Sequence, residues 1–212
     1  MSGTDSNPGD NSHLDTVRKQ LQACFSTSTA QSAGSFLHQD TRQSFPNPSI
    51  KIKDVGNVGL PMSPRDIDAV KQASHQAPFG KGTETIVDES VRKTWQINAT
   101  DIVCSNPRWE NWVTKEVLPK CCDALGVSAV AKPMVRAELY KMLLYEEGAH
   151  FQPHKDTEKA PGMFATLAIC LPTEHQGGDL VLKHNNQSLT WSSSNSSAFD
   201  LSFAAWYASF SF

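Results

Sequence analysis

The sequence predicts an α+β protein in which helices precede and support a series of short strands. Two observations lead to this prediction. An amphipathic helical pattern lies before residue 130, and after Pro133 short runs of strand-forming residues alternate with Pro-Gly, Gly-Gly and Asn-Asn turns. Helices followed by closely spaced strands are typical of a double-stranded β-helix, or jelly roll, buttressed by N-terminal helices.

The composition predicts one domain preceded by a tail. A chain of 212 residues is long enough to bury a hydrophobic core. Residues 1–60 are rich in Ser, Thr, Gln, Asn and Asp and contain few clustered apolar residues, so we expect a disordered tail that is dispensable for folding. The remaining residues, 61–212, form the expected domain, with a helical part at 61–130 and jelly-roll strands at 133–212.

Two helices have clear sequence signals. Ser63-Pro64-Arg65-Asp66 supplies an N-cap, a proline at the first helical position and an acid in the first turn, and this helix should stop near Pro78. Between residues 107 and 125 the apolar side chains keep to one helical stripe, which Gly126 ends. The tryptophans of that stripe are assigned to core packing.

The strand signals come mostly from the second half of the chain. One or two strands are expected between Thr85 and Ile97, around a turn at Asp88-Glu89. The later strands are expected at residues 135–145, 163–171, 179–183, 188–191 and 198–203.

Charge and composition disfavour several classes of partner. The net charge of -3 and sequence pI of about 6.1 provide no basic surface for nucleic acid. The N-terminus lacks the pattern of a signal peptide, and no apolar run approaches the roughly 18 residues of a membrane span. The odd number of cysteines, 5, favours buried thiols in a reducing compartment. We therefore expect a cytoplasmic or nuclear protein with no membrane partner.

A His-x-Asp motif is the strongest candidate for chemistry. On a strand, residues i and i+2 face the same side, so His154 and Asp156 would point together into the barrel while Lys155 points outward. A neutral imidazole and a carboxylate are two of the three protein ligands in the facial triad of non-haem Fe(II). On its own the motif is also consistent with a solvated histidine beside a solvated aspartate.

The sequence around this motif is more specific than the motif itself. A Tyr-x-x-Gly strand end precedes His154, an apolar strand follows Asp156, and a Gly-Gly turn then leads into the next strand; these features lie in segments 139–156, 162–172 and 177–182. Together they resemble the Fe(II)/2-oxoglutarate-dependent oxygenases of prolyl 4-hydroxylase type, over about residues 135–207. The segment 95–125 also resembles the helical region of fungal members.

The resemblance implies a cofactor, a cosubstrate and a reaction. Fe(II) would be bound by His154 and Asp156, and 2-oxoglutarate would be converted to succinate and CO2 while a substrate C–H bond is hydroxylated, with ascorbate as an optional reductant. Tyr145, or less favourably Tyr140, would donate a hydrogen bond to the far carboxylate of 2-oxoglutarate; the alternative is a core or rim tyrosine. The substrate, a protein side chain or a small molecule, is not indicated by the sequence.

The sequence departs from this family after Tyr207. The family has a distal histidine on a late strand and then an Arg or Lys that pairs with 2-oxoglutarate, whereas residues 208–212 are Ala-Ser-Phe-Ser-Phe. His150 would lie roughly 13 Å from His154 along a strand, too far to share an ion. His175 and His184 are expected in solvated loops or strand ends.

The domain is therefore expected to be truncated, with the C-terminal jelly-roll strands missing, and to turn over little or no 2-oxoglutarate. The alternatives are a catalytically dead jelly roll that acts as a binding or regulatory module, and an unrelated metal- or sugar-binding jelly roll.

Overall fold

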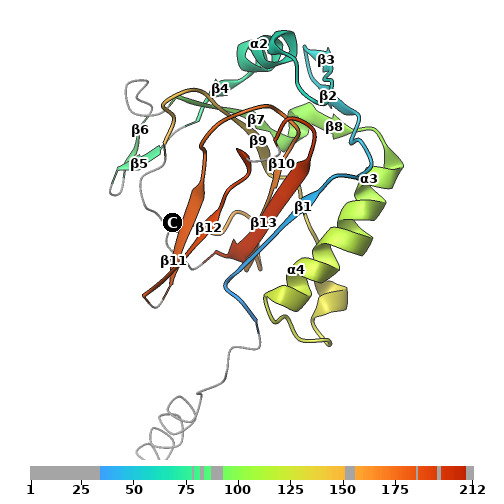
Figure 1. Cartoon of the computed structure of the whole chain (residues 1–212), viewed down its shortest axis with the longest axis vertical. Helices are drawn as coiled ribbons and strands as arrows, with labels where there is room; N and C mark the ends of the chain where they lie inside the picture. Colours follow the sequence, from blue (N-terminus) through green and yellow to red (C-terminus); the bar gives the residue numbers. More distant parts are fainter. Residues whose placement is uncertain are drawn as a thin grey trace, which may run out of the picture. The chain divides into compact units, whose positions relative to one another are not determined.

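The computed structural model describes residues 34–77, 79–81, 84–86, 93–150, 156–184, 186–194 and 197–208. They form a mixed α+β fold in which small antiparallel sheets predominate and helices are few (Figure 1). The α+β class predicted from the sequence is thus confirmed.

The helical elements are short. They are α2 (Pro64–Ala73), α3 (Pro107–Trp112) and α4 (Leu118–Ala124), a π-helix η2 (Val113–Val117) between the last two, and the 3-10 turns η1 (Ala99–Asp101) and η3 (Lys132–Met134).

The strands come from both halves of the chain. They are β1 (Leu37–Arg42), β2 (Ile50–Ile52), β3 (Gly56–Asn57), β4 (His75–Gln76), β5 (Phe79–Lys81), β6 (Glu84–Ile86), β7 (Thr94–Asn98), β8 (Ile102–Cys104), β9 (Lys141–Tyr145), β10 (Ala165–Cys170), β11 (Leu180–His184), β12 (Gln187–Trp191) and β13 (Leu201–Tyr207).

One sheet has three strands in the order β1-β13-β10, and both pairings are antiparallel. The first six residues of β13 are buried, as expected for a central strand covered on both faces. Because side chains alternate along a strand, Phe203 and its odd-numbered neighbours face one side and Trp206 and its even-numbered neighbours face the other.

One face of this sheet packs against the helical segment α3-η2-α4, which runs beside β1 and β13 in Figure 1. The cluster at this interface comprises Trp112, Val117, Cys121, Leu125, Leu201, Phe203 and Ala205. Phe203 is fully buried, and its ring meets that of Trp112 edge-on at a centroid distance of 6.5 Å. This interface is the larger part of the core around the sheet.

The opposite face packs against the hairpin β11-β12, which lies next to β13 in Figure 1. Leu182 of the hairpin is fully buried against Leu37, Ala204 and Trp206 of the sheet. The result is a three-layer arrangement of helices, sheet and hairpin, with β13 in the middle layer.

Another hydrophobic cluster joins two of the other small sheets to α2. Sheets β3-β2-β8 and β4-β7-β9 contribute Ile52, Ile97 and Ile102, and α2 contributes Val70. Ser63 caps α2 as predicted: its hydroxyl accepts a hydrogen bond from the Asp66 amide, and the Asp66 carboxylate accepts one from the Ser63 amide.

The predicted helix at 107–125 is confirmed, with a π-helical turn in its middle. Pro119 has no amide hydrogen, so the carbonyl four residues before it cannot be satisfied in the α-helical register. At the boundary the Leu118 amide donates to the carbonyl of Val113, five residues back, which is the π pattern. Gly126 follows the helix with φ of 77°, a conformation that favours glycine.

The structure differs from the predicted tail over residues 34–60. Strands β1, β2 and β3 lie in this range, and β1 pairs along its full length with β13, from Leu37 opposite Trp206 to Arg42 opposite Leu201. The partner that stabilises β1 lies far away in sequence. A local count of apolar residues therefore could not detect it.

The later strands agree with the prediction at β10, β11 and β12 and differ at two places. Strand β9 begins at Lys141 rather than residue 135, and β13 spans Leu201–Tyr207 rather than 198–203. The expected helical part also contains strands β4 to β8. None of the helices in the described part of the chain is long and apolar enough to pass through a bilayer.

Candidate functional site

Asp156 lies against one end of the β1-β13-β10 sheet, where β10 begins and β13 ends. Its Oδ2 atom accepts a hydrogen bond of 2.6 Å from the hydroxyl of Thr166 on β10 and one of 3.2 Å from the indole N–H of Trp206 on β13. Thr166 and Trp206 are directly opposite each other in the antiparallel pairing. Two neighbouring strands therefore fix the position of one carboxylate oxygen.

This carboxylate is on the side of the sheet that faces the hairpin. Trp206 and Ala168 belong to the cluster that contains Leu182 of β11, and Thr166 has the same strand parity as Ala168. The Asp156 carboxylate thus lies on the hairpin side of the sheet and not on the helical side.

The other predicted metal ligand, His154, and Lys155, which was expected to face outward, lie outside the described residues. The expectation that the side chains of His154 and Asp156 converge therefore stays a prediction. In the part of the chain that the structure describes, no three His, Cys, Asp or Glu side chains gather closely enough to hold a metal ion.

The tyrosines proposed to contact 2-oxoglutarate occupy a different sheet from Thr166 and Trp206. Tyr145 ends β9, pairs with Thr94 of β7 and is 50% exposed. Tyr140 precedes β9 and is similarly exposed, with the ammonium of Lys141 4.7 Å from its ring centroid. The two rings lie at opposite ends of β9, and the role of Tyr145 stays a prediction.

Of the other histidines considered, His175 has the most specific contacts. Its ring contacts the carbonyl of Thr173 and the hydroxyl of Ser193, so it is tied to its neighbours rather than merely solvated. His184 ends β11, and its ring lies 5.6 Å from that of Phe36 in a tilted contact, whereas His150 lies in the exposed turn after β9.

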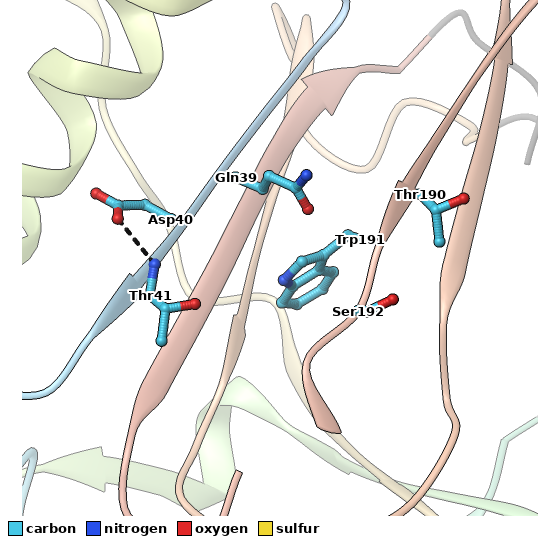
Figure 2. Close-up of a pocket in the computed structure, with 6 residues that line it drawn as sticks. All are labelled: Gln39, Asp40, Thr41, Thr190, Trp191 and Ser192. Carbon is cyan, nitrogen blue, oxygen red and sulfur yellow. Dashed lines mark hydrogen bonds between the residues drawn. The ribbon is translucent and has the colours of Figure 1, made fainter. Parts of the chain in front are cut away.

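A small cavity of about 290 Å³ lies between β1 and the end of the hairpin. Figure 2 shows its lining residues, Gln39, Asp40, Thr41, Thr190, Trp191 and Ser192. The Gln39 side chain extends toward the indole of Trp191, whereas the Asp40 carboxylate turns away and accepts a hydrogen bond from the Thr41 amide. The cavity is polar, with one aromatic wall.

Sequence reasoning did not anticipate Thr166 and Trp206 as partners of Asp156. The segment around Thr166 is almost uniformly apolar, and a single hydroxyl in such a strand is a signal for an inward polar contact. Trp206 gave no such signal, because an indole is more often part of a core.

Comparison of the whole chain with protein-family models, curated proteins and solved structures gives no match.

Proposed function

We propose that this chain contains the metal-binding strand of an Fe(II)- and 2-oxoglutarate-dependent oxygenase, carried on part of a jelly roll. The observation that carries the proposal is the fixed position of Asp156 on the hairpin side of the sheet, where Thr166 and Trp206 each donate a hydrogen bond to one of its oxygens. A metal-ligating carboxylate is commonly oriented by hydrogen bonds of this kind.

The arrangement of strands supports the jelly-roll part of the proposal. Strands β10 and β13 pair antiparallel in one layer, and the hairpin β11-β12 packs across them as a second layer. Two facing layers of short antiparallel strands are shared by jelly rolls and other β-sandwiches. We propose that a metal site would lie on the side of the sheet that faces the hairpin, where the Asp156 carboxylate is bound.

The residues present fit a metal ion in part. Asp156 supplies a carboxylate beside polar partners, and His154 would supply an imidazole two residues earlier on the same segment. Bound Fe(II) would supply the oxidative chemistry that converts 2-oxoglutarate to succinate. The residues of this chain would hold the ion, and Thr166 and Trp206 would hold Asp156 in one orientation.

The proposal includes low activity for the chain of 212 residues. One imidazole and one carboxylate leave a metal held largely by water, so a bidentate cosubstrate would compete with loss of the ion itself. Loss of a group that only orients a ligand commonly lowers metal affinity about 10- to 100-fold, and lack of a direct ligand is expected to cost more.

The metal site can be tested by titrating the full chain with Mn(II), a redox-stable substitute for Fe(II), and following the free ion by electron paramagnetic resonance. We expect weak binding that Asp156→Asn and His154→Ala each reduce at least about 10-fold. Asp179→Asn is the matched control, because it neutralises an exposed carboxylate in the turn before β11. Equal binding by wild type and Asp156→Asn would contradict the metal proposal.

Catalysis can be tested by succinate formation under O2 with Fe(II), ascorbate and 2-oxoglutarate. We expect wild type to form little more succinate than His154→Ala does. His154-dependent succinate at the rate of a normal oxygenase would show that a third ligand is present, and His175 and His184 would be mutated next. If the wild type neither binds the metal nor forms succinate, the alternative function is favoured. That alternative is a binding or regulatory module in which Asp156 only anchors its segment to the sheet.

A further inference from the structure

Ser193 and His175 form a hydrogen-bonded pair that is separate from Asp156. The Nε2 atom of His175 lies 3.0 Å from the hydroxyl oxygen of Ser193, and its Nδ1 atom lies 2.8 Å from the carbonyl oxygen of Thr173. Both side chains are partly exposed. The pair joins the loop between β10 and β11 to the segment that follows β12.

The Thr173 carbonyl determines which nitrogen carries the proton. A carbonyl oxygen can only accept a hydrogen bond, so in the neutral ring Nδ1 carries the hydrogen and donates it. Nε2 is then left with its lone pair directed at Ser193, whose hydroxyl donates to it. This is the relation between a serine nucleophile and its general base, with the base oriented by a third group.

The two loops are held together by contacts that do not involve the imidazole. Ser197 is 5% exposed. The Ser197 hydroxyl accepts a hydrogen bond of 3.1 Å from the His175 amide, and the Ser197 carbonyl accepts one of 2.8 Å from the Thr173 amide. The distance between the His175 ring and Ser193 is therefore set by the backbone of both loops. A preorganised pair of this kind loses little entropy when it reacts.

Cys170 lies next to this pair and does not compete with it as a nucleophile. Burial raises the pKa of the Cys170 thiol above its usual value, although the nearby Ser193 and Ser202 hydroxyls act in the opposite direction. The thiol donates a hydrogen bond of 3.9 Å to the carbonyl of Leu171, and a protonated thiol is a poor nucleophile. The nucleophile in this cluster is the hydroxyl of Ser193.

The turn after His175 contains two glycines in the left-handed region. Gly177 and Gly178 have φ of 69° and 78°, and a side chain added at Gly178 would lie 3.9 Å from the His175 ring, in ordinary van der Waals contact. The turn therefore approaches the imidazole with no side chain at Gly178.

We propose that Ser193 is a nucleophile activated by His175, and that it reacts with small carboxylic esters. Ser193 Oγ forms a bond to the carbonyl carbon of the ester as its proton passes to Nε2 of His175. The alcohol then leaves with that proton, which gives an acyl-serine. Attack by water, with His175 again taking the proton, releases the carboxylic acid and restores the hydroxyl.

The probe for this reaction is p-nitrophenyl acetate, used with the full chain. We expect release of p-nitrophenol and acetylation of Ser193, located by peptide mass spectrometry. Ser193→Ala should abolish modification at this position, and His175→Gln should slow it about 100-fold or more, since general-base catalysis contributes about 10²- to 10⁴-fold. Ser188→Ala is the matched control because it removes an exposed hydroxyl from β12, and it should react like wild type.

The pH dependence distinguishes activation by His175 from a structural role. The rate should rise as the imidazole loses its proton and then become constant, because only the neutral ring can accept the proton of Ser193. Thermal denaturation of each variant shows whether the fold persists. Acetylation of Ser193 at an equal rate in a folded His175→Gln variant, or modification confined to lysines or Cys170, would overturn the proposal.

Discussion

Replacement of Phe203 by alanine tests the three-layer arrangement most directly. Phe203 is fully buried in the middle of β13, on the face that packs against the helices. Its ring lies 6.5 Å from that of Trp112 in an edge-on contact and 5.9 Å from the ring of His38. The substitution removes a large side chain from a place where neighbouring helices and strands cannot close the gap.

The expected loss follows from these contacts. Truncation of a buried phenylalanine costs about 3–5 kcal/mol. The edge-on aromatic contact adds about 0.5–1.5 kcal/mol that simple burial does not include, so the cost should lie in the upper part of that range. For a domain of this size, a loss of about 4 kcal/mol lowers the melting temperature by about 8–16 °C.

The loss is measured by urea denaturation followed by tryptophan fluorescence, with Phe199→Ala as the matched control. Phe199 is 75% exposed in the segment before β13, so its removal should change the free energy of unfolding by less than about 0.5 kcal/mol. A Phe203→Ala variant that loses under about 1 kcal/mol would refute the buried position of Phe203, and a Phe199→Ala variant that loses as much as Phe203→Ala would refute the exposed position of Phe199.

Three further predictions concern other parts of the fold. Iodoacetamide should modify exposed Cys104 in the folded chain but not Cys121, because burial raises the pKa of the Cys121 thiol to about 12; equal labelling by peptide mapping would contradict this. Hydrogen bonds from Lys71 and Trp95 lower the pKa of Glu146, so its stabilisation is present above the usual carboxyl range and is lost as pH falls. When the free energy of unfolding is measured by urea denaturation at several pH values, Glu146→Gln should abolish this fall in stability at low pH. The fall is at most about 1 kcal/mol for a surface pair. Ser63→Ala should cost about 0.5–2 kcal/mol, and an unchanged melting temperature would show that the capping box contributes nothing.

The sequence predicted elements whose signals are local. The cap at Ser63, the end of the helix at Gly126 and the strand β10 all depend on neighbouring residues, and the structure has them where they were expected. Strand β1 was missed because its stability comes from pairing with β13, not from a pattern of its own. The π-helical turn was missed because only the backbone geometry around Pro119 reveals it.

The candidate sites show the same limit. Asp156 was identified because the His-x-Asp spacing is local, whereas its partners Thr166 and Trp206 are brought to it by the pairing of two strands. His175 was expected to be a solvated loop residue, and its partner Ser193 lies beyond a complete hairpin. Contacts between distant loops have no signature in a single sequence.

The position of β13 between β1 and β10 has a consequence for how the protein is made. Leu37 pairs with Trp206, so the sheet joins two segments separated by nearly the whole described chain. Long-range pairing of this kind slows folding. Strand β1 has no pairing partner until β13 has been synthesised. Until then β10, which lies in the uncharged segment 163–172, also lacks β13 as its neighbour. An unpaired apolar strand is prone to aggregate. During synthesis this segment is therefore exposed to aggregation until β13 pairs with it.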